Sequence, residues 1–320
     1  MNPEAKKMKL VVNTSLLYGK EFEFYIPENE ENSYEIDWGD GNLIKSEEVD
    51  NNYVKHTYQD EEKYTVTISG VVKQLGISTN KGLIKIEQWG ELGLESLYGA
   101  FYNCYNLTEI ASPTKNSFKD VTNFYVCFVY TGITSIPENL FANCPNVTNF
   151  SECFLDTEIT SIPENLFANC PNVTDFSGCF SSTKITSIPE KLFANCPNVT
   201  NFSECFSDTE ITSIPENLFA NCPNVTDFSG CFSDTEITSI PENLFKKCSK
   251  VDNFLWTFAN CYNLENYLEL WKSEYYEKEN KNVSETTVGE SCFGFDDSEK
   301  CLIQNFERIP EYWRKPSDRK

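Results

Sequence analysis

The polar side chains that are best able to contact a ligand recur every 26 residues in this sequence and are not clustered in one segment. Four successive units contribute a Thr, an Asn or Asp, and a Ser, which form three polar rows: Thr148, Asn149, Ser151, Thr174, Asp175, Ser177, Thr200, Asn201, Ser203, Thr226, Asp227 and Ser229. Short hydroxyl and amide groups in rows can donate and accept hydrogen bonds along an extended ligand. We predict these twelve residues as a binding site for a glycan or a protein, provided that this strand face is the open one. Hydrogen bonding confined to the ladder is the alternative.

Carboxylates form a second regular pattern. Stacking of the units would place equivalent residues about 5 Å apart, the spacing of paired strands. Like charges at that distance repel, so such a row must face water, counter-ions or a ligand. A solvated edge is the expected role, and binding of divalent cations or a basic partner is the alternative. One row comprises Glu138, Glu164, Glu190, Glu216 and Glu242, and a second row, which a lysine interrupts, comprises Glu158, Lys184, Glu210 and Glu236.

Catalytic and cofactor-binding patterns are missing from the sequence. His56 is the only histidine, which leaves nucleophilic catalysis without its usual base and argues against a histidine-rich metal site. No CxxC or CxxH pair, glycine-rich phosphate loop, GxSxG or HExxH motif occurs. We therefore predict a non-enzymatic protein with no catalytic residues, no cofactor and no metal site.

Fourteen cysteines are present, none of them before Cys104, and most follow the 26-residue period. Secreted disulfide scaffolds are short and cysteine-dense throughout, unlike this chain. A reduced cysteine packs as a small apolar residue, so the sequence favours two buried cysteine columns. Disulfides between the columns, for example Cys144 with Cys153, are one alternative, and zinc binding is another.

All these rows arise from one repeated sequence. ITSIPENLFANCPNVTDFSGCFSDTE recurs with few changes between about Gly132 and Phe258. Residues 138–189 and 190–241 differ at only four positions, which indicates duplication of a two-unit block. A period of about 20–50 residues indicates stacked units, each of which buries its apolar side against its neighbours. We therefore predict that deletion of residues 164–189 leaves a folded protein that melts cooperatively.

The repeated segment resembles a known family. FYNCYNLTEI, FANCPNVTNF and FANCYNLENY share the pattern F-x-x-C-x-N-[LV], and ITSIPENLF accompanies it. Over about 190 residues this pattern is similar to the BspA-like leucine-rich repeats of microbial surface proteins. The resemblance implies a curved right-handed solenoid and a role in adhesion to host cells, matrix or other microbes. Each coil is expected to carry two short strands, at about 173–178 and 185–188 in the second unit.

A row of asparagines within the repeat matches the acceptor pattern for N-glycosylation. The row comprises Asn146, Asn172, Asn198 and Asn224, each followed by Val-Thr. Because no secretory signal is recognisable, we interpret these residues as turn formers.

The segment before the repeats has a different pattern. Short alternating runs between about Lys9 and Ser78, separated by Gly, Asn and Asp, predict β-strands. EIDWGDG, followed by KHTYQDEEKYTVTISG, resembles the PKD domain, an immunoglobulin-like sandwich of extracellular proteins. One departure is Glu61-Glu62-Lys63, which stands where that family has a turn glycine. The resemblance implies an immunoglobulin-like β-sandwich here.

Five residues of this region have definite expected roles. Trp38 and Tyr58 should lie in the core between the sheets, and Asp37 and Asp40 should shape a hairpin turn. Calcium binding by the two aspartates is the alternative, but a calcium site needs about six to eight oxygens. His56 is expected to be a packed strand residue rather than a catalytic base.

The predicted fold class is mostly β. We expect a PKD-like, immunoglobulin-like β-sandwich over residues 1–80, a leucine-rich-repeat solenoid of about six 26-residue coils over 81–270, and a C-terminal capping segment over 271–320. Terminal repeats must cover the open end of a stack. The degenerate repeat around Cys292 and Phe293 fits that role.

The chain is strongly acidic, since 26 Lys and Arg residues against 49 Asp and Glu residues give a formal net charge of −23. Phosphate binding needs clustered basic groups, so nucleic acid is not an expected partner. No run of about 20 apolar residues predicts a transmembrane segment.

We therefore predict a recognition or adhesion protein at a cell or virion surface, which binds a protein or glycan ligand on a cell or matrix surface through its repeat face. The PKD-like module and the duplicated repeat favour this function. An intracellular scaffold for protein–protein interaction is the alternative, because no signal peptide is recognisable and the cysteines follow a core pattern. A receptor-binding or decoration protein attached to a virion is a further alternative.

Overall fold

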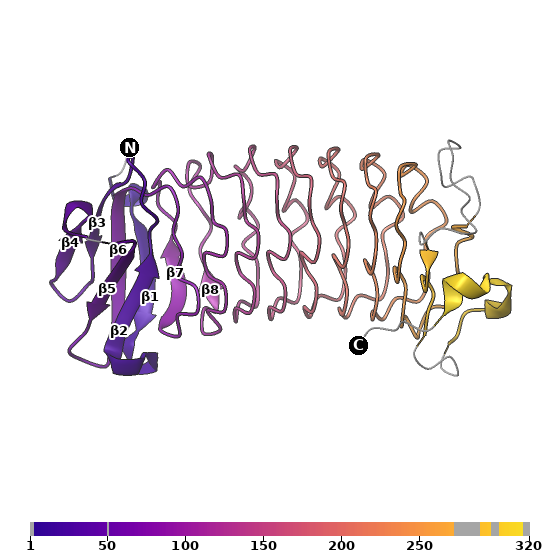
Figure 1. The fold of residues 1–320 in the computed structure, drawn as a ribbon, viewed down its shortest axis with the longest axis horizontal. Coiled ribbons are helices and arrows are strands. Elements are labelled where there is room, and N and C mark those ends of the chain that lie inside the picture. Colours follow the sequence, from indigo (N-terminus) through magenta and orange to yellow (C-terminus); the bar gives the residue numbers. More distant parts are fainter. Residues whose placement is uncertain (1–2, 50, 272–288, 296–300, 316–320) are drawn as a thin grey trace.

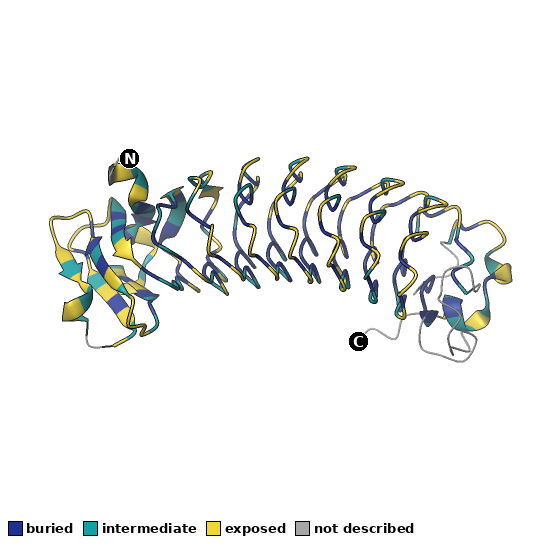
Figure 2. Cartoon of the chain, turned by 90° about the horizontal axis from the view of Figure 1, so that it is seen from above, coloured by how far each residue is buried: buried dark blue, intermediate teal, exposed yellow. Residues whose placement is uncertain are grey.

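In the computed structural model of the protein, a β-sheet region at the N-terminal end leads into a long stack of coils (Figure 1). The structure describes residues 3–49, 51–271, 289–295 and 301–315. Seen from above, the stack is gently curved, with buried residues inside each coil and exposed residues along its edges (Figure 2). No α-helix occurs among the described residues.

Eight β-strands form the N-terminal region and the first coils. Six of them form a sheet in the order β4-β3-β6-β1-β7-β8, and β2 and β5 pair separately. All pairs are antiparallel except β7 with β8. The strands are β1 (Met8–Asn13), β2 (Glu21–Tyr25), β3 (Ser33–Asp37), β4 (Leu43–Lys45), β5 (Tyr53–Thr57), β6 (Lys63–Val71), β7 (Leu83–Gln88) and β8 (Glu109–Ile110).

Short 3₁₀ helices connect these strands and end the described chain. They are η1 (Pro3–Lys6), η2 (Thr14–Leu16), η3 (Tyr18–Lys20), η4 (Ser46–Glu48), η8 (Phe306–Arg308) and η9 (Glu311–Arg314). In β1, buried residues alternate with half-buried ones, and in β2 exposed residues alternate with buried ones up to the half-buried Tyr25, as the period-2 pattern predicts for half-buried sheets.

The core of the N-terminal region contains the aromatic residues that the sequence singled out. Trp38 and Tyr58 are buried, and the Tyr58 hydroxyl donates to the Trp38 carbonyl oxygen at 3.0 Å. His56 lies between them, with its ring 5.0 Å from that of Trp38 and 4.7 Å from that of Tyr58. Both expected core residues are confirmed, and His56 is a packed strand residue.

The turn after β3 depends on the two aspartates of the sequence EIDWGDG. Asp37 Oδ1 accepts from the Gly39 N–H at 2.9 Å, and Asp40 Oδ1 accepts from the Asn42 N–H at 3.0 Å. Asp40 Oδ2 lies 2.7 Å from His56 Nε2. Burial opposes ionisation of Asp40, but these hydrogen bonds lower the pKa of its carboxyl group. The expected turn role is therefore confirmed.

One sheet continues from the N-terminal region into the repeats. β1 pairs with β7, and β7 pairs in parallel with β8, so backbone hydrogen bonds connect residues on both sides of residue 80. Trp89 is buried at this junction and donates from Nε1 to the Ala111 carbonyl oxygen at 2.7 Å. The domain boundary at residue 80 stays a prediction, but the two parts share a hydrogen-bonded sheet.

The repeats are built from turns more than from strands. Each coil contributes a single parallel bridge residue, in the order Asn123, Asn149, Asp175, Asn201, Asp227 and Asn253. The prediction of a full strand at 173–178 is wrong, because only Asp175 bridges and turn begins at Ser177; 185–188 forms no strand. The physical reason lies just after the bridge, where Glu152 and Asp156 have left-handed backbones with φ of 52° and 52°. Such residues bend the chain and end the extended segment.

Three columns of buried phenylalanines fill the coils. Neighbouring rings within each column lie 5.3–6.1 Å apart between centroids and within 12° of parallel. These are offset-stacked arrangements, which aromatic pairs prefer to a face-to-face sandwich. The columns comprise Phe124, Phe150, Phe176, Phe202, Phe228 and Phe254; Phe101, Phe128, Phe154, Phe180, Phe206, Phe232, Phe258 and Phe293; and Phe141, Phe167, Phe193, Phe219 and Phe245.

The C-terminal segment continues this stack where it is described. Phe293 stacks on Phe258, and the Phe258 N–H donates to the Cys292 carbonyl oxygen at 2.8 Å. The buried Trp313 follows, since the Phe293 N–H donates to its carbonyl oxygen at 2.8 Å. The cap over 271–320 stays a prediction, because residues 272–288, 296–300 and 316–320 lie outside the described part.

The cysteines belong to the core. All fourteen are free, and all are buried except Cys301, which is half-buried. Burial raises the pKa of these thiols, for Cys144 to about 12. The structure therefore has the cysteine columns as core packing rather than as disulfides.

This burial predicts slow reaction with thiol reagents in the folded protein. Because the thiolate is the reactive form, we expect at most Cys301 to react rapidly with Ellman's reagent, and all fourteen cysteines to react after denaturation without a reductant. Absorbance of the released thionitrobenzoate before and after denaturation counts both sets. Fewer thiols after denaturation would indicate disulfides and contradict the packing described here.

The candidate binding face

The three predicted polar rows lie together on one face of the stack, which we call the ladder face (residues 148–156 and their equivalents in the next three coils). The Thr174 N–H donates to the Thr148 carbonyl oxygen at 2.9 Å, and Thr200 and Thr226 repeat this bond. The row of bridge residues runs beside it, from Asn149 to Asp227. The fold therefore brings all twelve predicted residues into register.

The threonine row is the most accessible of the three. Thr148, Thr174 and Thr200 are exposed, and Thr226 is half-buried. Each hydroxyl donates to the threonine carbonyl oxygen of the preceding coil, at 3.2–3.3 Å. A hydroxyl oxygen also accepts hydrogen bonds, so this row offers a ligand acceptors rather than donors.

The bridge residues use their side chains to shape the turn that follows. Asn149, Asp175, Asn201 and Asp227 each accept through Oδ1 from the backbone N–H of the serine two residues later, at 2.7–2.8 Å. This is the local hydrogen bond that makes Asn and Asp common in turns. In Asn149, Asp175 and Asn201 the second side-chain atom is the group that can contact a ligand, whereas Asp227 Oδ2 accepts from Asn253 Nδ2 at 3.0 Å.

The serine row is less open than the sequence suggested. Ser151 is buried and donates to Asn149 Oδ1 at 2.7 Å. Ser177, Ser203 and Ser229 are half-buried. The accessible part of the ladder face is therefore the threonine row with the outer atoms of the Asn and Asp row. Whether these twelve residues bind a ligand stays a prediction.

A feature that we did not assign from the sequence is an alternating column of Glu and Gly beside these rows. Glu152, Gly178, Glu204 and Gly230 occupy equivalent positions with φ between 52° and 60°. A Cβ atom on Gly178 would lie 3.1 Å from Glu152 Cγ. Each glutamate thus has a glycine in the next coil. The signal in the sequence is the alternation of NFSECF and DFSGCF.

The Glu152 carboxylate is unfavourable in the folded protein. Burial, followed by the charges of Glu204 and Asp175, raises the pKa of its carboxyl group. The folded state thus binds the carboxyl proton of Glu152 more tightly than the unfolded state does. The ionised carboxylate therefore destabilises the folded protein when the pH is above the folded-state pKa. This destabilisation disappears as the pH falls through that pKa toward the unfolded value of about 4.3.

We therefore expect Glu152→Gln to stabilise the protein at pH 7. The gain should be below about 1 kcal/mol, because the side chain is partly exposed and solvent screens its interactions. The gain should disappear below about pH 4, where both forms are neutral. Urea unfolding at both pH values measures it, with the exposed Glu164→Gln as the matched control. A gain that does not depend on pH would show that the charge is not its cause.

The two carboxylate rows lie on exposed edges. Glu138, Glu164, Glu190, Glu216 and Glu242 are all exposed, and Glu216 Oε1 accepts from Asn243 Nδ2 at 3.0 Å. In the second row, Lys184 forms an ion pair with Glu158. The described residues contain no group of three or more His, Cys, Asp or Glu side chains that could hold a metal ion.

Asparagine side chains connect neighbouring coils on another edge. The Nδ2 atoms of Asn146, Asn172, Asn198 and Asn224 donate to backbone carbonyl oxygens of the preceding coil at 2.8–3.0 Å. A parallel set is formed by Asn169, Asn195 and Asn221 at 2.9–3.0 Å. The asparagines therefore join successive coils, a role beyond the turn formation that we expected.

The repeats match one family model. The model of the BspA type leucine rich repeat region, which comprises six copies, matches residues 96–226 and 181–312. The chain belongs to this BspA-type family. The match spans most of the coils and includes the FANCPNVT sequences that carry the cysteine and phenylalanine columns. The family match does not extend to the N-terminal region, so the expected PKD-like identity of that region stays a prediction, and no curated protein matches the sequence.

Two solved structures match the BspA-type chain over part of its length. The APL1 leucine-rich repeat domain has 18% identity and a TM-score of 0.34, and the match covers 46% of this chain and 37% of that one. The Toll–Spatzle complex from Drosophila has 16% identity and a TM-score of 0.36, with 67% and 34% covered. The chain thus matches little more than a third of the length of either.

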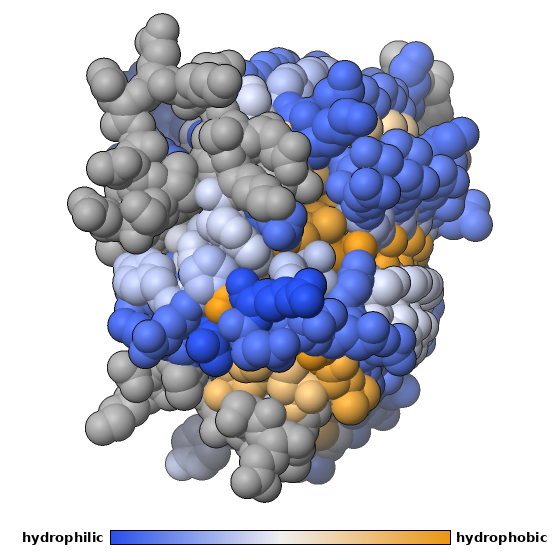
Figure 3. Space-filling model, turned by 90° about the vertical axis from the view of Figure 1, so that its right-hand side faces the viewer, coloured by the Kyte–Doolittle hydropathy of each residue, from blue (hydrophilic) through white to orange (hydrophobic). Residues whose placement is uncertain are grey.

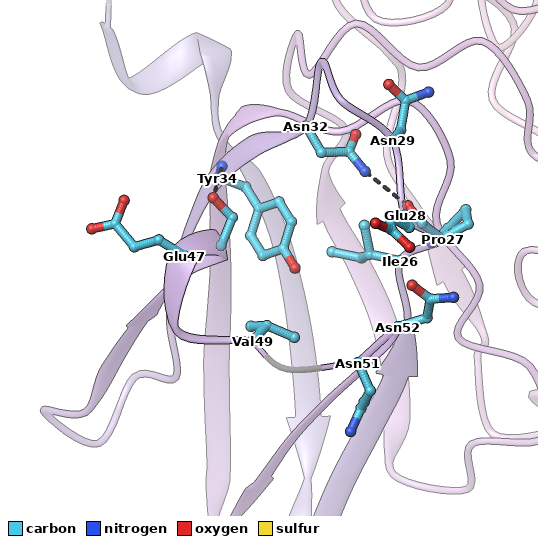
Figure 4. Close-up of a pocket in the computed structure, with 11 residues that line it drawn as sticks. Ile26, Pro27, Glu28, Asn29, Asn32, Tyr34, Glu47, Val49, Asn51 and Asn52 are labelled. Atoms are coloured by element: carbon cyan, nitrogen blue, oxygen red, sulfur yellow. Dashed lines mark hydrogen bonds between the residues drawn. The ribbon is translucent and has the colours of Figure 1, made fainter.

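A pocket of about 430 Å³ in the N-terminal region is lined by Tyr34, Val49 and Asn32, whose Nδ2 donates to the Pro27 carbonyl oxygen at 2.9 Å (Figure 4). Asn32 Oδ1 accepts from the Lys73 N–H, so both ends of this amide have partners. The C-terminal end presents a mainly hydrophilic surface with smaller apolar patches (Figure 3).

No helix among the described residues is long and apolar enough to cross a bilayer.

Proposed function

We propose that this BspA-type protein is a non-enzymatic recognition protein, displayed on a cell or virion surface, which binds a protein or glycan through its ladder face. One observation carries the proposal. Four successive coils present the same short polar side chains in register, from Thr148 to Ser229. A solenoid surface of this kind suits an extended ligand, because every coil repeats the same contact.

The chemistry of the face narrows the class of ligand. The segments 148–156, 174–182, 200–208 and 226–234 contain no Lys, Arg or His, and they contain seven carboxylates: Glu152, Asp156, Asp175, Glu204, Asp208, Asp227 and Asp234. The threonine hydroxyls there accept hydrogen bonds. The face therefore suits ligands that bring donors or positive charge, such as sugar hydroxyls or basic side chains.

The surface location rests on the resemblances of both parts. Leucine-rich repeats of this family are typical protein-binding scaffolds, and the WGDG and YTVT sequences of the N-terminal region resemble extracellular PKD domains. The fourteen free cysteines favour a second candidate, a scaffold in a reducing compartment.

The proposal is tested by binding of fluorescently labelled protein to intact cells and to matrix-coated surfaces. Saturable binding is expected, and replacement of Thr148, Thr174 and Thr200 together by Gln should weaken it by at least about tenfold, since hot-spot losses are of this size. The matched control replaces Glu164, Glu190 and Glu216 by Gln on the other edge and should bind as the parent does. Absence of saturable binding, or equal loss in both variants, would refute the proposal.

A further inference from the structure

A second candidate surface lies where the N-terminal region meets the first coils (Figure 1). A pocket of about 770 Å³ is lined there by Tyr25, Tyr53, Tyr98 and Tyr102, together with Gln74 and Glu23. We call it the tyrosine pocket. Tyr25 and Tyr53 are cross-strand partners on β2 and β5, and Tyr98 and Tyr102 belong to the first coils.

Backbone hydrogen bonds connect the wall from β2 to the coils through the segment that contains Gly76. The Tyr25 N–H donates to the Gly76 carbonyl oxygen at 2.7 Å, and the Gly76 N–H donates to the Tyr25 carbonyl oxygen at 2.8 Å. On the other side, the Thr79 N–H donates to the Tyr102 carbonyl oxygen at 2.7 Å. Gly76 itself lines the pocket. The two walls are therefore held in one arrangement, which lowers the cost of ordering the pocket when a ligand binds.

The tyrosine rings of the pocket are exposed, whereas the phenylalanine columns of the stack are buried. Tyr53, Tyr98 and Tyr102 are 55%, 50% and 37% exposed. Ring centroids are 5.2 Å apart between Tyr25 and Tyr53 and 5.5 Å apart between Tyr98 and Tyr125. Clustered exposed aromatic rings mark binding surfaces, because they supply contact area at a low cost in conformational entropy.

The charge around the pocket favours a basic ligand. The lining residues include Glu23 and no Lys, Arg or His. The charge of Glu152 raises the pKa of Tyr125, whose ring contacts Tyr98, so a second carboxylate lies close to the same wall. Positive side chains are attracted both by carboxylates and by the faces of tyrosine rings.

A proline-rich segment has the chemistry to pack against this wall of tyrosines. A polyproline II helix has about three residues per turn, leaves its backbone carbonyls free and is preformed before binding. Such segments dock in grooves lined by aromatic side chains, where their rings pack between the aromatic rings. Tyrosine hydroxyls and the Gln74 amide can donate to the free carbonyls.

We propose that the tyrosine pocket binds a proline-rich peptide segment that carries Lys or Arg residues. The pocket is separate from the threonine row of the ladder face, so the two proposals can fail independently.

The experiment uses the full chain and a labelled octaproline peptide with two arginines at each end, with fluorescence polarisation as the readout. Three comparison ligands are octaproline with glutamates in place of the arginines, a Gly-Ser peptide with the same arginines, and the neutral glycan chitohexaose, followed by calorimetry. The arginine octaproline should bind saturably and at least about tenfold more tightly than each of the others. Equal binding of the Gly-Ser peptide, preference for chitohexaose, or no saturable peptide binding would overturn the proposal.

Variants of exposed residues locate the site without disturbing the core. Tyr53→Ala and Tyr98→Ala should each weaken binding of the arginine octaproline by about tenfold, and Tyr18→Ala, which removes a fully exposed ring outside the pocket, should not. Gly76→Val fills the pocket instead of opening it, because an added Cβ comes no closer than 3.7 Å to Tyr25, and it should also block binding. The triple threonine variant of the ladder face should bind the peptide as the parent does. Unchanged binding in the tyrosine variants would overturn the proposal.

Discussion

Replacement of Phe180 by alanine is expected to lower the free energy of unfolding by about 3–5 kcal/mol, the range for large-to-small changes of buried phenylalanine. Phe180 is fully buried, and its ring stacks between those of Phe154 at 5.7 Å and Phe206 at 5.8 Å. Loss of the ring leaves a cavity that identical neighbours on both sides line but cannot fill. Urea unfolding followed by circular dichroism measures the change.

Thr186→Ala is the matched control in the same coil, because Thr186 is exposed. Surface substitutions of this kind change stability by less than about 0.5 kcal/mol. A loss below about 1 kcal/mol for Phe180→Ala would mean that the coil collapses around the gap. It would contradict the rigid aromatic columns described here.

Deletion of residues 190–241, a block of two units, should leave a protein that folds and melts in one transition. The deletion joins two nearly identical sequences, so the glycine at 178 meets the coil of Trp256 just as Gly230 does in the parent. Because 52 of 320 residues are removed, the denaturant dependence of unfolding should fall by about one sixth, in proportion to the surface exposed. Circular dichroism in urea tests both statements.

Deletion of one unit, residues 164–189, should also leave a folded protein but at a greater cost per residue removed. It places Glu204 directly after Glu152, where the parent has Gly178, so two carboxylates meet and a Cβ occupies the space beside Glu152 Cγ. Glu204→Gly in the shortened protein should recover the loss. If both deletions lose the same stability per residue removed, and Glu204→Gly recovers none of it, the alternation of Glu and Gly has no energetic role. Failure of both deletions to fold would refute the stack of autonomous coils.

Much of the architecture follows from the repeat. A 26-residue step with Phe and Cys at fixed registers predicts their burial in columns, because each unit has no other place for its apolar residues. Trp38, Tyr58 and the two turn aspartates also follow from local sequence, since their roles depend on near neighbours.

Other features depend on contacts that no local pattern encodes. The pairing of β1 with β7 joins residues more than seventy positions apart. The strand predicted at 173–178 is reduced to one bridge, because Gly178 and Ser182 have left-handed backbones. A β-like sequence does not reveal these backbone conformations. Likewise, the threonine row follows from the sequence, but the donation of each hydroxyl to the preceding coil depends on the stacked backbone.

The same column of the ladder connects the two proposed sites. Tyr98 and Tyr125 stand at the positions that Ser151 and Ser177 occupy in later coils, since each precedes the left-handed residue of its turn. The stack therefore changes from exposed aromatic rings near β2 and β5 to short polar side chains further along.

The most direct test of a surface recognition protein is its location. Intact cells or particles that carry the protein are treated briefly with protease, and the released peptides are identified by mass spectrometry. We predict that repeat peptides such as those around Thr174 are released while cytosolic marker proteins stay intact. Release of these peptides only after lysis, together with their cysteines trapped as free thiols, would contradict a surface location and leave the intracellular scaffold.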